Sequence, residues 1–142
     1  MTGFLLDTNV LSEFKRRGAP DPQVTSWLRA TDPDLLWASV LSSGEIRKGI
    51  ERLAPGRRRA VLEKWLDVDL DRWFEERLIP VSKAIADRWG MLTAAGLKKG
   101  SQLSSVDGLI AATASVHELT VVTRNVKDFE SLGVAIVNPW KG

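Results

Sequence analysis

Three acidic residues, Asp7, Glu45 and Asp107, occupy positions in the sequence from which they could act together. Asp7 directly follows the apolar run Gly3–Leu6, and the other two each stand three residues after a serine at a predicted helix start. Carboxylates that gather without compensating cations raise one another's pKa, so such a cluster is stable mainly when a divalent cation neutralises it. The chemistry predicted for these residues is therefore metal-assisted hydrolysis, in which the ion activates water and polarises a phosphoryl oxygen.

Each of the three acids also has a structural interpretation, which stays open at the level of sequence. Asp, Thr and Asn are favoured N-caps, and one residue of Asp7–Asn9 must begin the next helix. Ser42–Glu45 matches the capping box Ser-x-x-Glu, and Ser104–Asp107 repeats this spacing with an aspartate. Taken singly, the acids are helix-terminal residues that the helix macrodipole stabilises. Only a fold that brings all three together makes them a site.

The elements that must position these acids follow from apolar runs that alternate with helical patterns. This alternation predicts an α/β fold, with a small central parallel sheet flanked by helices on both faces. In such sheets ligands bind beyond the carboxyl ends of the strands, where Asp7 and Thr123–Asn125 are predicted to lie. The predicted strands are Gly3–Leu6, Leu35–Ala38, Leu78–Val81, Leu119–Thr123 and Val134–Val137. One predicted helix ends near Gly18, and another follows Ser39 and Ser42 and ends at Leu53. The other predicted helices are Pro22–Ala30, Arg57–Arg77, Lys83–Ala95 and Val106–Val116.

Composition excludes several other kinds of site. The chain has 142 residues, enough for one domain with a core of its own. It has no cysteine for a disulfide or a thiolate zinc site, and its one histidine, His117, is not placed for a Ser-His-Asp mechanism. Oxygen ligands then favour Mg²⁺ or Mn²⁺. No apolar stretch approaches the roughly 18–20 residues that span a bilayer, so we expect a cytoplasmic protein with no membrane partner.

Basic residues provide a second and weaker indication. The net charge is only +2, but Lys and Arg cluster at Lys15–Arg17, Arg57–Arg59 and Lys98-Lys99. Such clusters could line a path for nucleic-acid phosphates, which supply most of the affinity that is independent of base sequence. Each could equally be a solvated surface turn, so these clusters alone predict no partner.

Four segments, taken in order, resemble the motifs of the PIN-domain family. Phe4–Glu13 resembles the first motif, Ser39–Arg47 the second and Leu103–Ala112 the third. The ending Val122–Phe129, followed by Asn138–Trp140, is similar to the C-terminal signature of VapC-type toxins, including the FitB-like branch. Because the matches run from residue 4 to residue 140, the resemblance implies a PIN-like fold, with a single PIN domain over residues 1–142.

The resemblance also implies a function. A VapC-type protein is the toxin of a type II toxin–antitoxin pair, an endoribonuclease that depends on Mg²⁺ or Mn²⁺. It forms a homodimer and is inhibited by its cognate antitoxin, through which alone the pair binds operator DNA. In the family the first three acids hold the metal and orient the attacking water, and the matching positions here are Asp7, Glu45 and Asp107.

The fourth acidic position of the family is open in this chain. Many relatives have an aspartate where this chain has Asn125, which could still coordinate a cation but brings no charge. Asp128 could substitute for it, or could simply be an acid in the first turn of a helix that Asn125 caps. Thr123 and Asn9 are expected to support the site by hydrogen bonds. Arg124 is expected to bind phosphate or to have a structural role.

Three functions therefore stand side by side. The first is RNA cleavage by metal-assisted phosphodiester hydrolysis, directed at single strands because their bases are accessible. The second is a weakly catalytic or non-catalytic PIN module that binds its antitoxin and supports operator binding. The third is a nuclease directed at DNA. The RNA target is not determined by the sequence.

Overall fold

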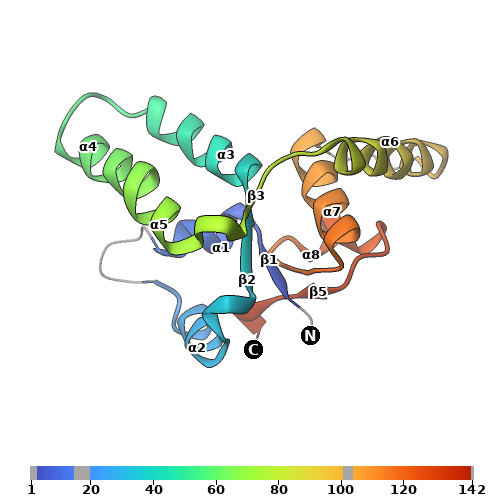
Figure 1. The fold of residues 1–142 in the computed structure, drawn as a ribbon, viewed down its shortest axis with the longest axis horizontal. Helices are drawn as coiled ribbons and strands as arrows, with labels where there is room; N and C mark the ends of the chain where they lie inside the picture. The colour runs from blue at the N-terminus through green and yellow to red at the C-terminus, as the bar shows by residue number, and fades with distance from the viewer. Residues whose placement is uncertain (1–2, 15–19, 101–103, 142) are drawn as a thin grey trace.

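Five parallel strands form the centre of the computed structural model, which describes residues 3–14, 20–100 and 104–141 (Figure 1). They are β1 (Phe4–Leu6), β2 (Leu36–Ser39), β3 (Leu78–Ile79), β4 (Thr120–Val122) and β5 (Ile136–Val137). Their order in the sheet is β3-β2-β1-β4-β5, and every neighbouring pair is parallel. All five lie within or overlap the predicted strands, so the predicted parallel sheet is confirmed.

Helices cover both faces of this sheet, which confirms the predicted α/β architecture. Figure 1 shows α1, α3, α4 and α5 on one side and α6, α7 and α8 on the other. Their bounds are α1 Thr8–Phe14, α2 Pro22–Ala30, α3 Val40–Glu51, α4 Arg57–Lys64, α5 Asp71–Phe74, α6 Lys83–Lys98, α7 Ser105–His117 and α8 Val126–Glu130. A π-helical segment, η2 (Trp65–Leu70), joins α4 to α5, and single 3₁₀ turns are η1 (Pro33–Leu35), η3 (Glu75–Arg77) and η4 (Pro139–Lys141).

The sheet separates two hydrophobic cores. Successive side chains of a strand point to opposite faces, so Leu5 and Val121 belong to one core and Leu6 and Val122 to the other. This burial on both faces explains why the strands are apolar runs without polar alternation. The helices contribute Ile85, Ile110 and Phe129 to the first core, and Val10, Ile46 and Phe74 to the second.

The helix that carries Glu45 begins earlier than the capping box predicts. Ser39 is its N-cap, and the Ser39 hydroxyl accepts a hydrogen bond of 3.0 Å from the amide of Leu41. The prediction that Ser42 begins this helix is therefore wrong, because the strand β2 leads directly into α3 without a loop. Ser42 and Glu45 lie inside α3, three residues apart and hence on the same helix face.

The C-terminal end of α6 also differs from the prediction. The helix continues through Gly96 to Lys98, and the residue in the left-handed conformation is Gly100, with φ of 75°. A glycine inside a helix costs only about 1 kcal/mol, whereas the left-handed position after a helix end strongly favours glycine. Gly100 thus marks the end of α6, and the predicted end at Ala95 is wrong by three residues. No helix in the described part of the chain combines the length and the apolar character needed to cross a bilayer.

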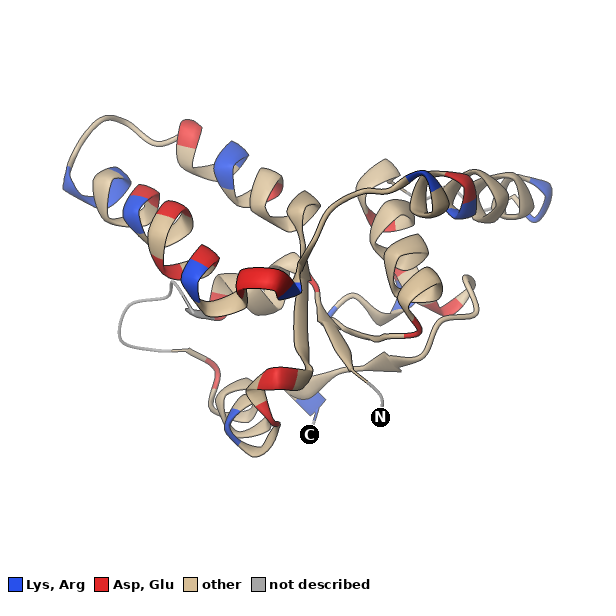
Figure 2. Cartoon of the chain, viewed as in Figure 1, with Lys and Arg blue, Asp and Glu red and all other residues tan. Residues whose placement is uncertain are grey.

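One of the predicted basic clusters has a structural role. Figure 2 shows basic residues at the start of α4, where Arg57–Arg59 lie. Arg59 forms ion pairs with Glu51 and Glu63 and donates a hydrogen bond of 3.1 Å to the carbonyl of Leu53. These contacts connect the end of α3 to α4. The cluster Lys15–Arg17 lies outside the described residues.

Gly108 sets the distance between α6 and α7. A Cβ added at Gly108 would lie 2.9 Å from Cδ1 of Trp89, closer than side chains tolerate. We expect Gly108→Ala to lower the free energy of unfolding by about 1–2 kcal/mol, because the rigid indole must move and overpacked cores are destabilised. Urea unfolding measures this change. Gly90→Ala in α6 is the control, since nothing lies within 4 Å of its added Cβ. Equal stability of Gly108→Ala and Gly90→Ala would contradict the expectation.

Candidate active site

Asp7 lies where the carboxyl ends of the two central strands meet. Its amide donates a hydrogen bond of 2.9 Å to the carbonyl of Val122 in β4, and its side chain is only 4% exposed. One carboxylate oxygen accepts from the amide of Thr8 at 2.8 Å, and the other from the hydroxyl of Thr123 at 2.8 Å. An N-cap side chain accepts from an amide two or three residues later. The contacts of Asp7 differ from this pattern and join two strands instead.

Glu45 reaches the same edge of the sheet from α3. The hydroxyl of Thr8 lies within hydrogen-bond distance of Glu45 Oε1 and 2.9 Å from the hydroxyl of Ser42. A hydroxyl has one proton to donate. Thr8 therefore donates to Glu45 and accepts from Ser42, which itself is buried. This chain of hydroxyls holds the Glu45 carboxylate next to the residue that follows Asp7.

Asp107 lies in the first turn of α7. The hydroxyl of Ser104 accepts a hydrogen bond of 3.1 Å from the amide of Asp107, which confirms the predicted serine cap. The cap uses the backbone of Asp107. Burial raises the pKa of the Asp107 carboxyl, and the negative charges of Asp128 and Glu45 raise it further against the opposing hydrogen bond with Ser104.

The acids influence one another through space, although they come from different elements. Burial raises the pKa of Asp7 from 3.8 to about 6; hydrogen bonds from Thr123 and Thr8 oppose this, and the charges of Asp107 and Glu45 add to it. The structure therefore brings Asp7, Glu45 and Asp107 to one edge of the sheet, as predicted. Asp128, through its effect on Asp107, belongs to the same acidic centre.

The acids are near one another but not tightly gathered. In residues 3–14, 20–100 and 104–141, no group of three or more His, Asp or Glu side chains stands close enough to hold a metal ion as it is. Glu45 is held by Thr8, and Asp107 lies at the surface end of its helix. Side-chain movement would have to bring these carboxylates onto a common ion.

Thr123 is the polar centre of the loop that follows β4. It is fully buried, donates to Asp7 as described, and accepts a hydrogen bond of 3.0 Å from the amide of Asn125. The side chain of Asn9 donates to Asp7 and to Thr123, both at 3.3 Å, and accepts from the amide of Arg124 at 3.3 Å. Thr123 and Asn9 thus hold the Asp7 carboxylate in place.

Asn125 and Asp128 occupy the two positions that the sequence left open. Asn125 is the residue before α8, but its side chain makes no capping hydrogen bond. Asp128 is in the first turn of α8, as its structural interpretation predicts, and its charge also acts on Asp107. Of these two residues, Asp128 carries the charge that reaches the acidic centre.

Thr123→Val tests whether the Thr123 hydroxyl stabilises the Asp7 carboxylate. The substitution keeps the shape but removes a donor to Asp7 and an acceptor for Asn125. We expect a loss of about 1–3 kcal/mol in the free energy of unfolding, because buried polar groups lose their partners. The pKa of Asp7, followed by NMR of the carboxyl carbon, is expected to rise further. Thr120→Val at the half-buried start of β4 is the control, and an unchanged Asp7 pKa in Thr123→Val would contradict this assignment.

Two residues of the centre were not predicted to act on the site. Thr8 and Ser42 position Glu45, whereas the sequence assigned both to helix starts. A signal was present for each: Thr8 directly follows Asp7, and Ser42 precedes Glu45 by three residues. Ser42 lies inside α3, whose N-cap is Ser39, and its side chain is therefore free of a capping role.

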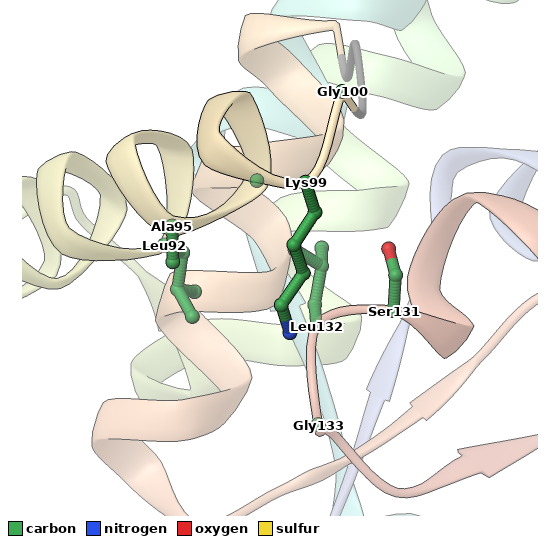
Figure 3. Close-up of a pocket in the computed structure, with 8 residues that line it drawn as sticks. Leu92, Ala95, Lys99, Gly100, Ser131, Leu132 and Gly133 are labelled. Atoms are coloured by element: carbon green, nitrogen blue, oxygen red, sulfur yellow. The ribbon is translucent and has the colours of Figure 1, made fainter.

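A hollow of about 530 Å³ lies apart from the acids, between the end of α6 and the segment after α8 (Figure 3). The side chain of Lys99 extends toward Leu132 and Ser131 across this hollow. The residues described along its wall are small, apolar or basic, and they include none of the four acids. It is therefore not a candidate for the hydrolytic site.

Comparison with known proteins agrees with this fold. A family model described as PIN domain matches residues 4–134. Toxin FitB of Neisseria gonorrhoeae is 34% identical over 96% of this chain and 97% of its own length. VapC ribonuclease Y4jK of Sinorhizobium fredii is 32% identical over 96% and 97%, respectively. The crystal structure of FitAcB from N. gonorrhoeae contains a chain that superposes with a TM-score of 0.89 at 34% identity, covering 96% of this chain and 98% of the other.

Proposed function

Because the chain belongs to the PIN-domain family, among the FitB and VapC toxins, we propose that it is the toxin of a type II toxin–antitoxin pair and a metal-dependent endoribonuclease. The observation that carries the proposal is the convergence of Asp7, Glu45 and Asp107 at the carboxyl edge of the parallel sheet. Relatives of more than 30% identity that include a protein named a VapC ribonuclease support the choice of RNA as substrate.

In this proposal Asp7, Glu45 and Asp107 hold Mg²⁺ or Mn²⁺. The donor set fits a hard divalent cation: all three ligands are carboxylates, and burial together with mutual repulsion raises the pKa of Asp7 and Asp107. When bound, the ion lowers the pKa of water and neutralises charge on the phosphoryl group. Asp128 is proposed as the fourth acid, with Asn125 as the alternative.

The remaining residues of the centre orient these ligands. Thr123 and Asn9 donate to Oδ2 of Asp7 and so fix its rotamer. Thr8 donates to Glu45 and holds its carboxylate next to the residue that follows Asp7. Loss of a residue that orients a metal ligand typically costs about 10–100-fold in metal affinity or activity.

The proposed partners are a cognate antitoxin and, through the antitoxin alone, operator DNA. Two similar structures support this: one is titled as FitAB bound to an IR36 DNA fragment, and another as DNA-bound VapBC from Salmonella typhimurium. Their TM-scores to this chain are 0.89 and 0.76, at 32% and 26% identity. A homodimer and a cytoplasmic location remain predictions.

The experiment that tests the function is cleavage by the purified chain of matched single-stranded RNA and DNA, with Mg²⁺, with Mn²⁺ and with a chelator. We expect the RNA alone to be cut, and only when an ion is present. Cleavage that survives chelation would overturn the metal dependence, and equal cutting of DNA would make the protein a DNA-directed nuclease. Absence of all cleavage, with tight antitoxin and operator binding, would favour the non-catalytic module. When variants of Asp7 and Asp107 are measured in this assay, Asp69→Asn is the control for loss of charge, because Asp69 is an exposed acid in η2.

A further inference from the structure

A cleft of about 890 Å³ opens beside the acidic centre. Asn125 and Asp128, the two candidates for the fourth position of the site, line this cleft. The cleft and the site therefore share a wall.

Arg124 and Trp140 form a cation–π pair on this wall. The guanidinium carbon of Arg124 lies 5.5 Å from the centroid of the Trp140 ring. Trp140 is half-buried and packs against the core that contains Leu6 and Val122, so the ring has a fixed support. Arg124 is exposed and covers this ring toward the cleft. The pair thus places a guanidinium group and an indole ring next to each other at the cleft.

The backbone on both sides of the pair is also held. The amide of Arg124 donates to the side chain of Asn9 at 3.3 Å, and Asn9 in turn donates to Asp7. The amide of Trp140 donates to the side chain of Asn138 at 3.0 Å. The Arg124–Trp140 pair is therefore connected to the same hydrogen-bond network that holds Asp7, the catalytic acid proposed above.

The chemistry of the cleft favours stacking over a general electrostatic attraction. Lys127 and Lys141 line it, but so do Asp21 and Glu130, so it is not a uniformly basic groove. Unpaired bases of RNA stack on aromatic rings and on Arg guanidinium planes. A lysine contributes a point charge to a phosphate and no such plane.

We propose that this cleft is a subsite for one nucleotide of a single-stranded RNA, next to the phosphate that is cut. The base stacks on the Arg124–Trp140 pair, and Lys127 and Lys141 contact the adjoining phosphates. The inference rests on the proposed function in taking RNA as the substrate. It adds the residues that bind the strand, and it predicts that the shape of the Arg124 side chain matters as well as its charge.

The test is binding of a fluorescein-labelled single-stranded RNA of about 12 nucleotides, by anisotropy, to the full chain that carries Asp7→Asn, in the presence of a chelator. In this background we expect Arg124→Lys, which keeps the charge, to weaken binding about 10-fold, because it removes the stacking plane. Arg72→Lys on α5, also exposed, is the control and is expected to bind as the parent does. Trp140→Phe should retain most of the affinity and Trp140→Leu should lose it, with circular dichroism to confirm folding.

Lys127→Gln independently tests whether Lys127 contacts a phosphate of the RNA. It is expected to reduce the slope of log Kd against log salt concentration by about 0.7, the value for one phosphate of a single strand. Parental affinity in Arg124→Lys, or an equal loss in Arg72→Lys, would overturn the subsite. RNA affinity that is unchanged by every one of these substitutions would also overturn the subsite. That result would point to a partner polypeptide in the cleft. Since no cleavage is measured, this result is separate from whether the wild-type chain cuts RNA.

Discussion

Asp7→Asn is expected to reduce RNA cleavage by about 1000-fold or more, since several kcal/mol of metal-dependent charge stabilisation would be lost. The same substitution is expected to make the metal-free protein more stable at neutral pH. The buried carboxylate costs free energy when it is charged, and an amide has no charge to bury. Loss of activity together with a gain of stability distinguishes a functional acid from a structural cap, whose removal would destabilise the helix.

The pH dependence of this effect follows from the pKa of Asp7. Its folded value of about 6 lies above the ordinary value of 3.8, so the folded protein binds the proton more tightly than the unfolded chain. The resulting stabilisation is fully present below about pH 4 and is lost as the pH rises through about 6. The difference between the two pKa values corresponds to about 3 kcal/mol.

Urea unfolding in the presence of a chelator measures this dependence. At about pH 8 we expect Asp7→Asn to be about 1–2 kcal/mol more stable than wild type, less than the full amount because the amide cannot accept from both Thr8 and Thr123. Near pH 4 the advantage should vanish. Added Mn²⁺ should stabilise the wild type and not the variant. A variant that is less stable by the same amount at both pH values would refute the cost assigned to the buried charge.

Asp107→Asn is the second substitution with a large expected effect. We expect cleavage to fall by about 1000-fold, since a proposed metal ligand loses its charge, while stability changes by less than about 1 kcal/mol. Stability is spared because the cap of α7 uses the amide of Asp107 and the hydroxyl of Ser104, and both remain. Single-turnover cleavage and thermal unfolding of the same preparation measure the two quantities. Wild-type cleavage by this variant would remove Asp107 from the site.

Asp128→Asn and Asn125→Ala, measured beside Asp107→Asn, decide the fourth position. If Asp128 completes the site, its substitution should lower cleavage by about 10–100-fold, as for residues that support a metal ligand. Asn125→Ala should then have little effect, since the side chain of Asn125 makes no capping hydrogen bond. The reverse order would assign the position to Asn125.

The sequence by itself determined the features that depend on neighbouring residues. Apolar runs at Gly3–Leu6 and Leu119–Thr123 predicted buried strands, and the helical patterns between the strands predicted a parallel sheet with helices on both faces. Asp7 was assigned to the carboxyl end of a strand for the same reason. The cap at Ser104 was also predicted, because an N-cap involves only the first turn of a helix.

Only the tertiary structure decided whether the acids form a centre. Asp7, Glu45 and Asp107 could each be explained as a helix-terminal residue until their charges were found to act on one another across three elements. Burial and Coulomb interactions depend on distance in space, which a local sequence pattern does not contain. For the same reason, the contact of Thr8 with Glu45 was not predicted.

Asp7, Glu45 and Asp107 thus differ in what the fold adds to them. Asp7 gains a pKa of about 6 from its burial between the central strands. Glu45 gains its orientation from Thr8 and Ser42, and Asp107 gains Asp128 as a charged neighbour. The residue types were present in the sequence, but their common edge exists only because the parallel strands end together.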